Sequence, residues 1–319
     1  MFIKHIINRK SDHPAKSDVT GITSSHARYP IVPGEIPSFN LVHILDTGAM
    51  HGLRGYRELI ETIAWGLAHL GMNVSISENA FQMDRANIVF GAQVLPVEDL
   101  LKLPTNTIIY NLEQMGGLDL SGNPVARTIA EHFQIWDYSK NNVASWQKLS
   151  PFHPVIHVPV GWAPVLNRIP KPALQDIDVL IYGKPGSLRL RVFNDLCLRG
   201  LKCLFVCGLY GQARDELIAR AKLILNINLY DHSRIFEMVR VSYLLANAKA
   251  VVADIQRDAM VEPELTDAVA FATPEKIVET CIDLLHNDAL REALEKRGQQ
   301  IIEQKSIVSI LSKTFGLVA

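Results

Sequence analysis

The chain has 319 residues, of which 48% are hydrophobic and 20% are charged. This composition is typical of a folded globular protein, and the length favours two compact domains over one. The 32 Lys and Arg nearly balance the 33 Asp and Glu, and a net charge of −1 excludes the strongly basic surface that nonspecific nucleic-acid binding needs. We therefore expect no nucleic-acid partner.

No stretch approaches the roughly 20 apolar residues of a membrane span, and the first ten residues lack the apolar core of a signal peptide. The cysteines lie in apolar runs without a CxxC pair, so we expect reduced thiols in the core. They are Cys197, Cys203, Cys207 and Cys281. These features predict a cytoplasmic protein without an integral membrane segment, in which peripheral contact with the inner membrane stays open.

Residues 1–38 are polar and broken by prolines, which indicates an extension rather than a domain. An alternation of short apolar strands with helices follows, including a helix at 56–70. The strands are expected at 41–45, 74–77, 87–90, 107–110, 134–136 and 155–158.

Four prolines between 159 and 172 predict a linker, and a second alternating series comes after it. Strands are expected at 178–182, 203–207, 223–228 and 250–253, and helices at 187–199, 212–221, 235–246 and within 274–302. The sequence therefore predicts an α/β protein of two Rossmann-like, doubly wound domains with a cleft between them. The N-terminal domain is expected at 39–168 and the C-terminal domain, with closing helices, at 169–319.

In an open parallel sheet, ligands bind beyond the carboxyl ends of the strands. The expected strand 178–182 leads into Gly183, Lys184 and the start of a helix at Ser187, which carries Arg189. A glycine turn, a cation and a capped helix start are what a phosphate requires. The alternative is an ordinary turn before a capped helix with solvated arginines.

The strand 223–228 leads into His232, Ser233, Arg234 and Ile235. Ser233 is expected to cap a helix whose first turn receives a phosphate, and Glu237, one turn later, to accept hydrogen bonds from ribose hydroxyls. In the alternative interpretation, Glu237 and Arg240 form an ordinary surface pair.

In the N-terminal half, Gly48 lies in a glycine-rich elbow that is expected to approach a pyrophosphate, and His51 in the same elbow is a candidate acid or base. Glu113 follows the strand 107–110, from which its carboxylate can act on a substrate hydroxyl. The alternatives are a plain loop histidine and a glutamate that holds a loop or a helix start.

Two apparent metal motifs lie in unsuitable places. Asp176 and Asp178 form a DxD sequence that enters a strand instead of leaving one. His153 and His157 have helical spacing, but Pro154 makes their segment extended. We expect no metal and no organic cofactor.

Three runs give the chain a resemblance to known proteins. They are NIVFGAQVL (87–95), IIYNLEQ (108–114) and GQARDELIARAKLILNINLYDHSRIFEMVRVSYLLANAKAVVAD (211–254). From about residue 40 onward the chain resembles bacterial GT-B glycosyltransferases of the CgeB-like or "glycosyltransferases group 1" type. The resemblance implies a nucleotide-sugar donor against the C-terminal domain and an acceptor against the N-terminal one.

The chain also departs from that pattern. Where many retaining enzymes of this type have a Glu, Tyr243 stands here, and Ala248 and Ala250 replace the usual Gly and Pro. Glu237 lies nearby, out of register.

The leading hypothesis is metal-independent transfer of a sugar from a nucleotide sugar to an acceptor, which is a polysaccharide, a lipid-linked sugar or a protein. Cations and helix starts of the C-terminal domain stabilise the leaving diphosphate, and Glu113 or His51 deprotonates the acceptor. The alternatives are a nucleotide-sugar epimerase or hydrolase on the same fold, and a noncatalytic nucleotide-binding partner of a glycosylation complex.

Overall fold

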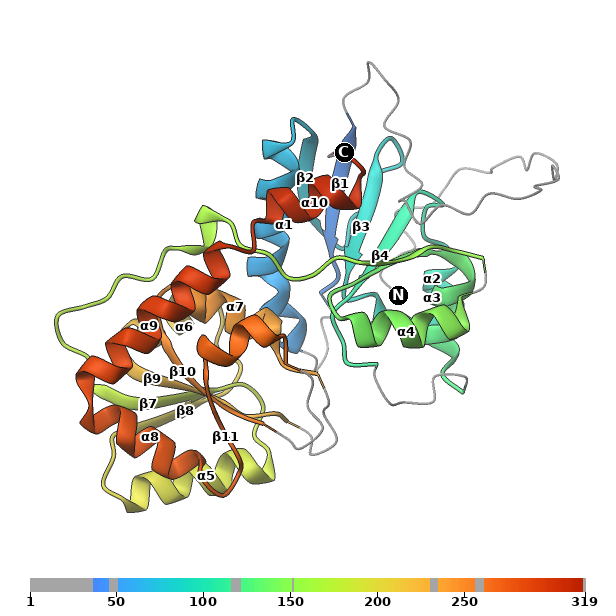
Figure 1. The fold of residues 1–319 in the computed structure, drawn as a ribbon. Coiled ribbons are helices and arrows are strands. Elements are labelled where there is room, and N and C mark those ends of the chain that lie inside the picture. The colour runs from blue at the N-terminus through green and yellow to red at the C-terminus, as the bar shows by residue number, and fades with distance from the viewer. Residues whose placement is uncertain are drawn as a thin grey trace, which may run out of the picture.

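The protein is described by a computed structural model of residues 37–45, 51–115, 122–150, 152–229, 235–255 and 261–317, with backbone alone at 51–53. Two α/β units lie side by side (Figure 1). Most of the predicted N-terminal extension lies outside the described residues. Within them, no helix is both long enough and apolar enough to cross a bilayer.

The first unit is built on a six-stranded parallel sheet with the order β2-β1-β3-β4-β5-β6. Its strands are β1 (Ser38–His43), β2 (Asn73–Glu78), β3 (Ala86–Phe90), β4 (Thr107–Asn111), β5 (Gln134–Asp137) and β6 (Val155–His157). Its helices are α1 (Arg57–His69), α2 (Val97–Leu100), α3 (Pro124–His132) and α4 (Lys140–Leu149), with short 3₁₀ helices at His51–Tyr56, Ala92–Val94 and Pro164–Leu166.

The second unit is built on a five-stranded parallel sheet with the order β11-β10-β9-β7-β8. Its strands are β7 (Ile177–Tyr182), β8 (Cys203–Val206), β9 (Ala221–Asn226), β10 (Ala250–Asp254) and β11 (Ala270–Ala272). The helices that follow them are α5 (Ser187–Leu198), α6 (Gly211–Arg220), α7 (Met238–Ala246), α8 (Ile277–His286), α9 (Asp288–Glu303) and α10 (Ile307–Thr314), with a 3₁₀ helix at Pro263–Asp267.

Neighbouring residues of the central strands are buried on opposite faces of each sheet. Leu41 packs with α1 on one face and Val42 with the α2–α4 side on the other. In the second unit Leu180 packs toward α6 and α7, and Val179 toward α5 and α8. Burial on both faces explains why these strands are continuous apolar runs, and it confirms the predicted doubly wound α/β architecture.

The structure corrects four expectations of local detail. Strand β11 has no counterpart in the predicted set. Helix α7 begins at Met238, three residues later than expected. Gly186, not Ser187, is the N-cap of α5. Two cysteines that were expected in the core, Cys197 and Cys207, are exposed.

The last helix, α10, leaves the second unit and packs on the first, beside α1 (Figure 1). A Cβ at Gly66 of α1 would lie 2.8 Å from Leu311 and 2.9 Å from Ile307, so only glycine permits this approach. Phe315 then packs its ring 5.5 Å from that of Phe39. The closing segment of the predicted 169–319 domain therefore completes the core of the other unit.

The chain crosses between the units twice, and the two crossings are hydrogen-bonded to each other. The Trp162 amide donates to the Lys305 carbonyl at 2.7 Å, and the Ile307 amide donates to the Trp162 carbonyl at 3.0 Å. Trp162 lies within the proline-rich linker that the sequence predicts. This double crossing connects the two sheets on the side of α1 and α10.

Candidate active site

The carboxyl end of β4 presents Glu113, an exposed carboxylate whose side chain has two partners. The Tyr56 hydroxyl donates to its Oε1, and the Gln93 amide donates to the same oxygen at 3.1 Å. Sequence reasoning found Glu113 from its place after a strand. It missed Tyr56 and Gln93, because each lies on a different element and only the fold brings them together.

A buried polar network fixes the backbone of this loop. Asn111 and Asn142 both donate side-chain amide protons to the Glu113 carbonyl, at 2.9 and 2.8 Å. Below them, Asp137 at the end of β5 accepts from Asn111 at 2.7 Å and from Trp146 at 3.0 Å. Side chains at the ends of β4 and β5 and in α4 therefore fix the loop that carries Glu113 by hydrogen bonds.

Asp137 is fully buried, with 0% of its surface exposed. Burial raises the pKa of its carboxyl to about 7, although the Ser139 amide and the side chains of Asn111 and Trp146 oppose the shift by hydrogen bonding. No cation pairs with Asp137 in the hydrogen bonds of the described residues. Its titration therefore couples folding to pH near neutrality.

The two units meet at the carboxyl ends of their sheets. The Gln114 side-chain amide donates to the Ile235 carbonyl at 2.8 Å, and its oxygen accepts from the Ile235 amide at 3.3 Å. Burial raises the pKa of the Tyr138 phenol, and the charges of Asp137, Glu237 and Glu113 raise it further. Carboxylates of both units thus lie near one phenol.

At the end of β7, Gly183 has a φ of +121°, which favours glycine. A Cβ at this position would lie 3.1 Å from Nη1 of Arg189 and 3.3 Å from Nη2 of Arg240. Two guanidinium groups therefore pack against the glycine turn. Lys184 follows directly, as the sequence predicts.

The Arg189 side chain is 2% exposed, so it is buried inside the turn rather than open to a ligand. Its Nε donates to the Ile227 carbonyl at 2.8 Å and its Nη1 to the Lys184 carbonyl at 2.7 Å. Burial and then the charge of Arg240 lower its pKa to about 10. Arg189 holds together the loops that follow β7 and β9.

Arg240, in the first turn of α7, is the more accessible of the two arginines, with 23% of its side chain exposed. It pairs with Glu237 at 3.2 Å, donates to Asn226 at 3.3 Å, and lies 5.1 Å from the centre of the Tyr182 ring. The Glu237 to Arg240 pair matches the alternative that the sequence left open. The sequence did not predict Arg240 as a ligand. Arg240 lies against Gly183 because α7 begins later than the sequence predicts.

Tyr243, which stands where the resemblance implies a Glu, is 2% exposed and belongs to the contact between the units. Its ring lies between the guanidiniums of Arg168 and Arg214, at 5.3 and 4.9 Å. Its hydroxyl donates to Asp215 at 2.7 Å and accepts from Arg168 at 3.1 Å. Tyr243 therefore holds Arg168 of the interdomain linker against the second unit.

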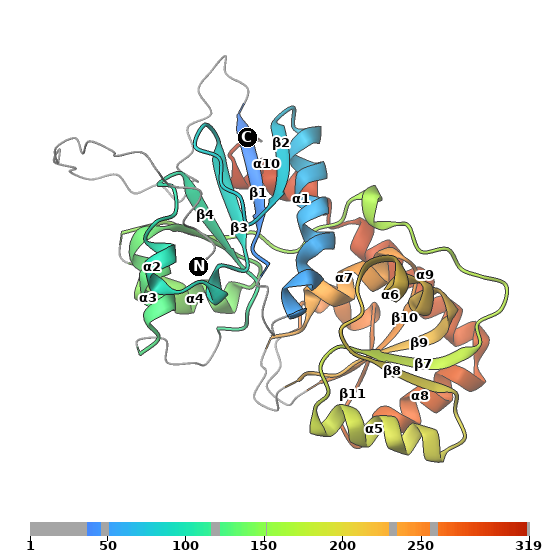
Figure 2. The same ribbon diagram turned by 180° about the vertical axis from the view of Figure 1, so that it is seen from behind.

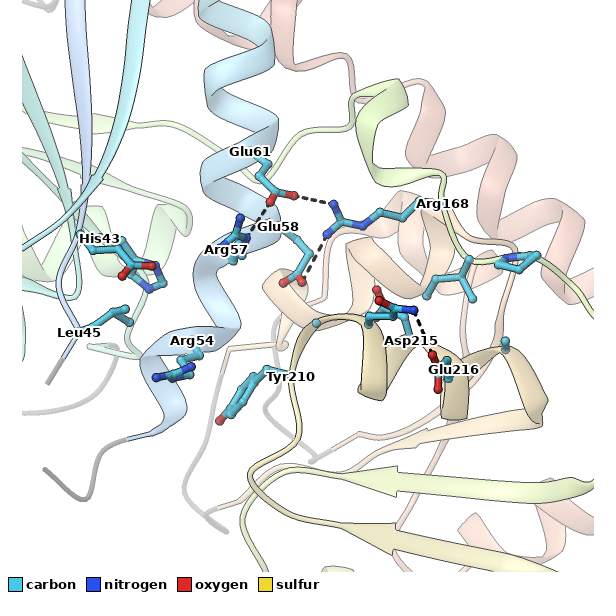
Figure 3. Close-up of a pocket in the computed structure, with 16 residues that line it drawn as sticks. His43, Leu45, Arg54, Arg57, Glu58, Glu61, Arg168, Tyr210, Asp215 and Glu216 are labelled. Atoms are coloured by element: carbon cyan, nitrogen blue, oxygen red, sulfur yellow. Dashed lines mark hydrogen bonds and ion pairs between the residues drawn. The ribbon is translucent and has the colours of Figure 1, made fainter. Parts of the chain in front are cut away.

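A pocket of about 790 Å³ lies between α1 of the first unit and α6 of the second (Figure 3). Arg168 of the linker bonds Glu61 at 2.6 Å across it, and Glu58 pairs with Arg214 of α6 at 2.7 Å. Figure 2 shows α1 beside α6 and α7 from behind. Arg54 and Tyr210 face one another at the other end of the pocket (Figure 3).

Several predicted site residues lie outside the described residues: Gly48, His232, Ser233 and Arg234. His51 opens the 3₁₀ helix His51–Tyr56, but its side chain is not described. The predicted ligand and acid–base roles of these residues stay predictions, but the predicted cap at Ser233 is wrong, because the N-cap of α7 is Glu237.

The two apparent metal motifs have other partners. Asp176 pairs with Arg220 at 2.6 Å and Asp178 with Lys222 at 2.8 Å, both at the amino end of the second sheet. His157 lies in β6, where its ring nitrogen is 3.2 Å from the Tyr138 carbonyl. Over the described ranges, no three His, Cys, Asp or Glu side chains converge in a manner suited to a metal ion.

Comparison with known proteins adds a fold-level likeness. No protein-family profile matches the chain. An uncharacterized protein of Acanthamoeba polyphaga mimivirus is 25% identical over 240 residues, which are 73% of this chain and 76% of that protein. Three solved structures share the architecture across nearly the whole chain.

Anabaena Alr3699/HepE, crystallised with UDP, is 11% identical with a TM-score of 0.55, over 89% of this chain and 100% of that one. AviGT4, a glycosyltransferase involved in avilamycin A biosynthesis, is 13% identical with a TM-score of 0.54, over 88% and 97%. T4 phage BGT, crystallised as a mutant with UDP-glucose, is 11% identical with a TM-score of 0.53, over 88% and 99%. The two Rossmann-like units of this chain therefore have the GT-B fold of glycosyltransferases.

Proposed function

We propose that this protein is a glycosyltransferase that moves a sugar from a nucleoside diphosphate to an acceptor hydroxyl. One observation carries the proposal: a carboxylate, Glu113, and a guanidinium, Arg240, stand at the carboxyl ends of two sheets that meet there. The fold likeness supports it, because HepE and T4 phage BGT were crystallised with UDP or UDP-glucose. Glycosyl transfer needs both groups, one for the proton and one for the leaving group.

The donor is proposed to bind the second unit, with its diphosphate at the Gly183 turn. Arg240 supplies the accessible guanidinium, and the adjoining Lys184 is a second cation. Arg189 acts indirectly, because its hydrogen bonds to the Lys184 and Ile227 carbonyls fix the loops around the diphosphate. Ser233 and Arg234 remain proposed ligands, as does Glu237 for the ribose.

The proposed reaction is a single displacement at the anomeric carbon. A bond forms between that carbon and the acceptor oxygen, whose proton passes to Glu113. The bond to the diphosphate oxygen breaks, and its electron pair stays on the leaving nucleoside diphosphate, beside Arg240. Such a displacement inverts the configuration at the anomeric carbon, which nuclear magnetic resonance of the product reports directly.

We further propose that the reaction needs no metal ion, since arginine can stabilise the leaving diphosphate. The expected result is an unchanged rate after treatment with a chelator. Polysaccharide, lipid-linked sugar and protein are the three acceptor classes to be screened.

Calorimetric titration of UDP into the protein and into Arg240→Gln tests the donor site. A charge-assisted contact to a buried anion is worth about 1.5–3 kcal/mol, so UDP affinity is expected to fall about 10- to 100-fold in the variant. GDP and dTDP, titrated in parallel, identify the preferred base.

Arg220→Gln is the matched control, because it removes an arginine at the opposite end of the same sheet, where Arg220 pairs with Asp176. Its UDP affinity is expected to equal that of the unchanged protein. Equal affinity in all three proteins would remove Arg240 from the site. No binding of any of the three nucleotides would contradict the proposed function.

A further inference from the structure

Two side chains from separate elements meet at one oxygen of Glu113. Tyr56 comes from the junction of a 3₁₀ helix with α1, and Gln93 from the 3₁₀ helix after β3. Both donate to Oε1, and the Gln93 amide also lies 3.3 Å from the Tyr56 hydroxyl. The three groups form a closed triangle of hydrogen bonds.

The two oxygens of Glu113 are therefore unlike. Oε1 has two donors, whereas Oε2 has no hydrogen-bond partner among the residues that the structure describes, and the side chain is exposed. A carboxylate held by one oxygen keeps the other for a substrate proton. This asymmetry is what a positioned general base requires.

The Tyr56 hydroxyl keeps its proton and donates it to Glu113 while it accepts from Gln93. Burial raises the pKa of Tyr56 well above its ordinary value, and the charge of Glu113 raises it further, so the proton stays on the phenol. The Tyr56 ring packs 6.4 Å from that of His43, and the Tyr138 phenol is influenced by the charges of both Glu113 and Glu237. Asp137, His43, Tyr138 and Glu237 are further titratable groups of this region.

We propose that Tyr56 and Gln93 are positioning residues that clamp Oε1 of Glu113, so that Oε2 receives the acceptor proton. The clamp rests on the proposed function for its purpose, but its hydrogen bonds can be tested without catalysis. Both donors restrain the same carboxylate oxygen. Without them, the Glu113 side chain should lose its fixed orientation.

The test is carbon-13 nuclear magnetic resonance of protein labelled at the glutamate side-chain carboxyl, with the Glu113 signal assigned by its loss in Glu113→Gln. In Tyr56→Phe the ring stays and only the donor is removed. At one fixed neutral pH, the chemical shift of the Glu113 carboxyl carbon is expected to change, because one of its two hydrogen-bond donors is gone. Gln93→Leu, at a half-buried position, is expected to change the same chemical shift by less.

Tyr110→Phe is the matched control, because the Tyr110 hydroxyl donates at 2.6 Å to the Val158 carbonyl and does not contact Glu113. The chemical shift of its Glu113 carbon should stay unchanged. The kcat of sugar-nucleotide turnover should fall in Tyr56→Phe, whereas KM for the sugar nucleotide should stay unchanged.

The possible outcomes separate the two proposals. An unchanged Glu113 carbon signal in both Tyr56→Phe and Gln93→Leu, in protein that turns over a sugar nucleotide, overturns the clamp alone. A changed Glu113 carbon signal in protein that neither binds nor turns over any sugar nucleotide supports the clamp and contradicts the proposed function.

Discussion

The carboxyl ends of the two sheets differ in how they hold charge. In the first unit, the carboxylates Glu113 and Asp137 are held by neutral donors such as Tyr56, Gln93 and Trp146. In the second unit, the guanidiniums of Arg189 and Arg240 pack against the glycine turn at Gly183, which has no side chain to keep them away.

The difference has chemical meaning. Neutral donors fix a carboxylate without cancelling its charge, so it can still accept a proton. Two adjacent guanidiniums concentrate positive charge, of which the Glu237 carboxylate offsets a part, and the excess favours an anion. One sheet is thus suited to proton transfer and the other to a diphosphate. Variants that change one unit at a time test this difference.

The largest effect is expected from removing the carboxylate of the first unit. Glu113→Gln keeps an oxygen that can accept from Tyr56 and Gln93 but removes the base. Loss of general base catalysis should reduce turnover of the sugar nucleotide about 10²- to 10⁴-fold. Release of UDP in a coupled assay measures the rate.

The affinity for UDP should stay within about twofold in Glu113→Gln, because binding belongs to the second unit in this comparison. Glu131→Gln, on the exposed side of α3, is the control and should match the unchanged protein in both measurements. A wild-type rate in Glu113→Gln would show that the base lies elsewhere.

A smaller effect is expected from filling the glycine turn of the second unit. Gly183→Ala introduces a Cβ at a φ of +121° and within 3.1 Å of Arg189. The backbone strain and the displaced guanidinium should together lower the free energy of unfolding by about 1–3 kcal/mol. Urea denaturation measures the loss, and UDP affinity should fall in the same variant.

Gly200→Ala separates backbone strain from contact, because Gly200 also has a positive φ, +81°, but no atom within 4 Å of an added Cβ. It should lose about 1 kcal/mol and keep its affinity for UDP. If both alanine variants bind UDP equally well, the turn does not support the anion site.

An effect of similar size to that of Gly183→Ala is a pH dependence that comes from Asp137 in the first unit. Its pKa is about 7 in the folded protein and near 3.8 when unfolded, so folding favours the protonated form. This contribution to stability is fully present below the unfolded pKa and is lost as the pH rises through 7. Between about pH 5.5 and pH 8 the free energy of unfolding should fall by about 2 kcal/mol.

Urea denaturation at both pH values checks this dependence, which Asp137→Asn should remove. Asp178→Asn is the control, because the pKa of Asp178 is shifted in the opposite direction to that of Asp137. Although burial opposes it, the Lys222 ammonium and the Lys202 amide hold the pKa of Asp178 below its usual range. Its contribution is therefore constant from pH 5.5 to 8. An equal pH slope in Asp137→Asn and in the unchanged protein would contradict the buried titration.

The strands of the fold could be predicted because most of them are apolar runs of four to six residues, buried on both faces. Strand β11 could not, since Ala270–Ala272 is three residues long and two of them are only half buried. The start of α7 was predicted too early. Ile235 and Phe236 are both buried and precede the helix, so their apolar character resembles a helical face in the sequence.

For the candidate site, sequence reasoning found the positions at the ends of strands, such as Glu113 and Gly183. It could not find partners that only tertiary structure supplies. Tyr56 lies 57 residues before Glu113, and Gln114 meets the Ile235 backbone across 121 residues. No periodicity or motif marks such pairs.

The return of α10 to the first unit makes that unit discontinuous in sequence. The second unit is in effect an insertion between β6 and α10, and a fragment that ends near residue 168 would leave the apolar surface of α1 around Gly66 uncovered. A fluorophore attached at the end of α10 would move with the first unit, as would a fluorophore on β1. A measurement of motion between the units therefore needs one label on the second unit itself, for example at the exposed Cys197.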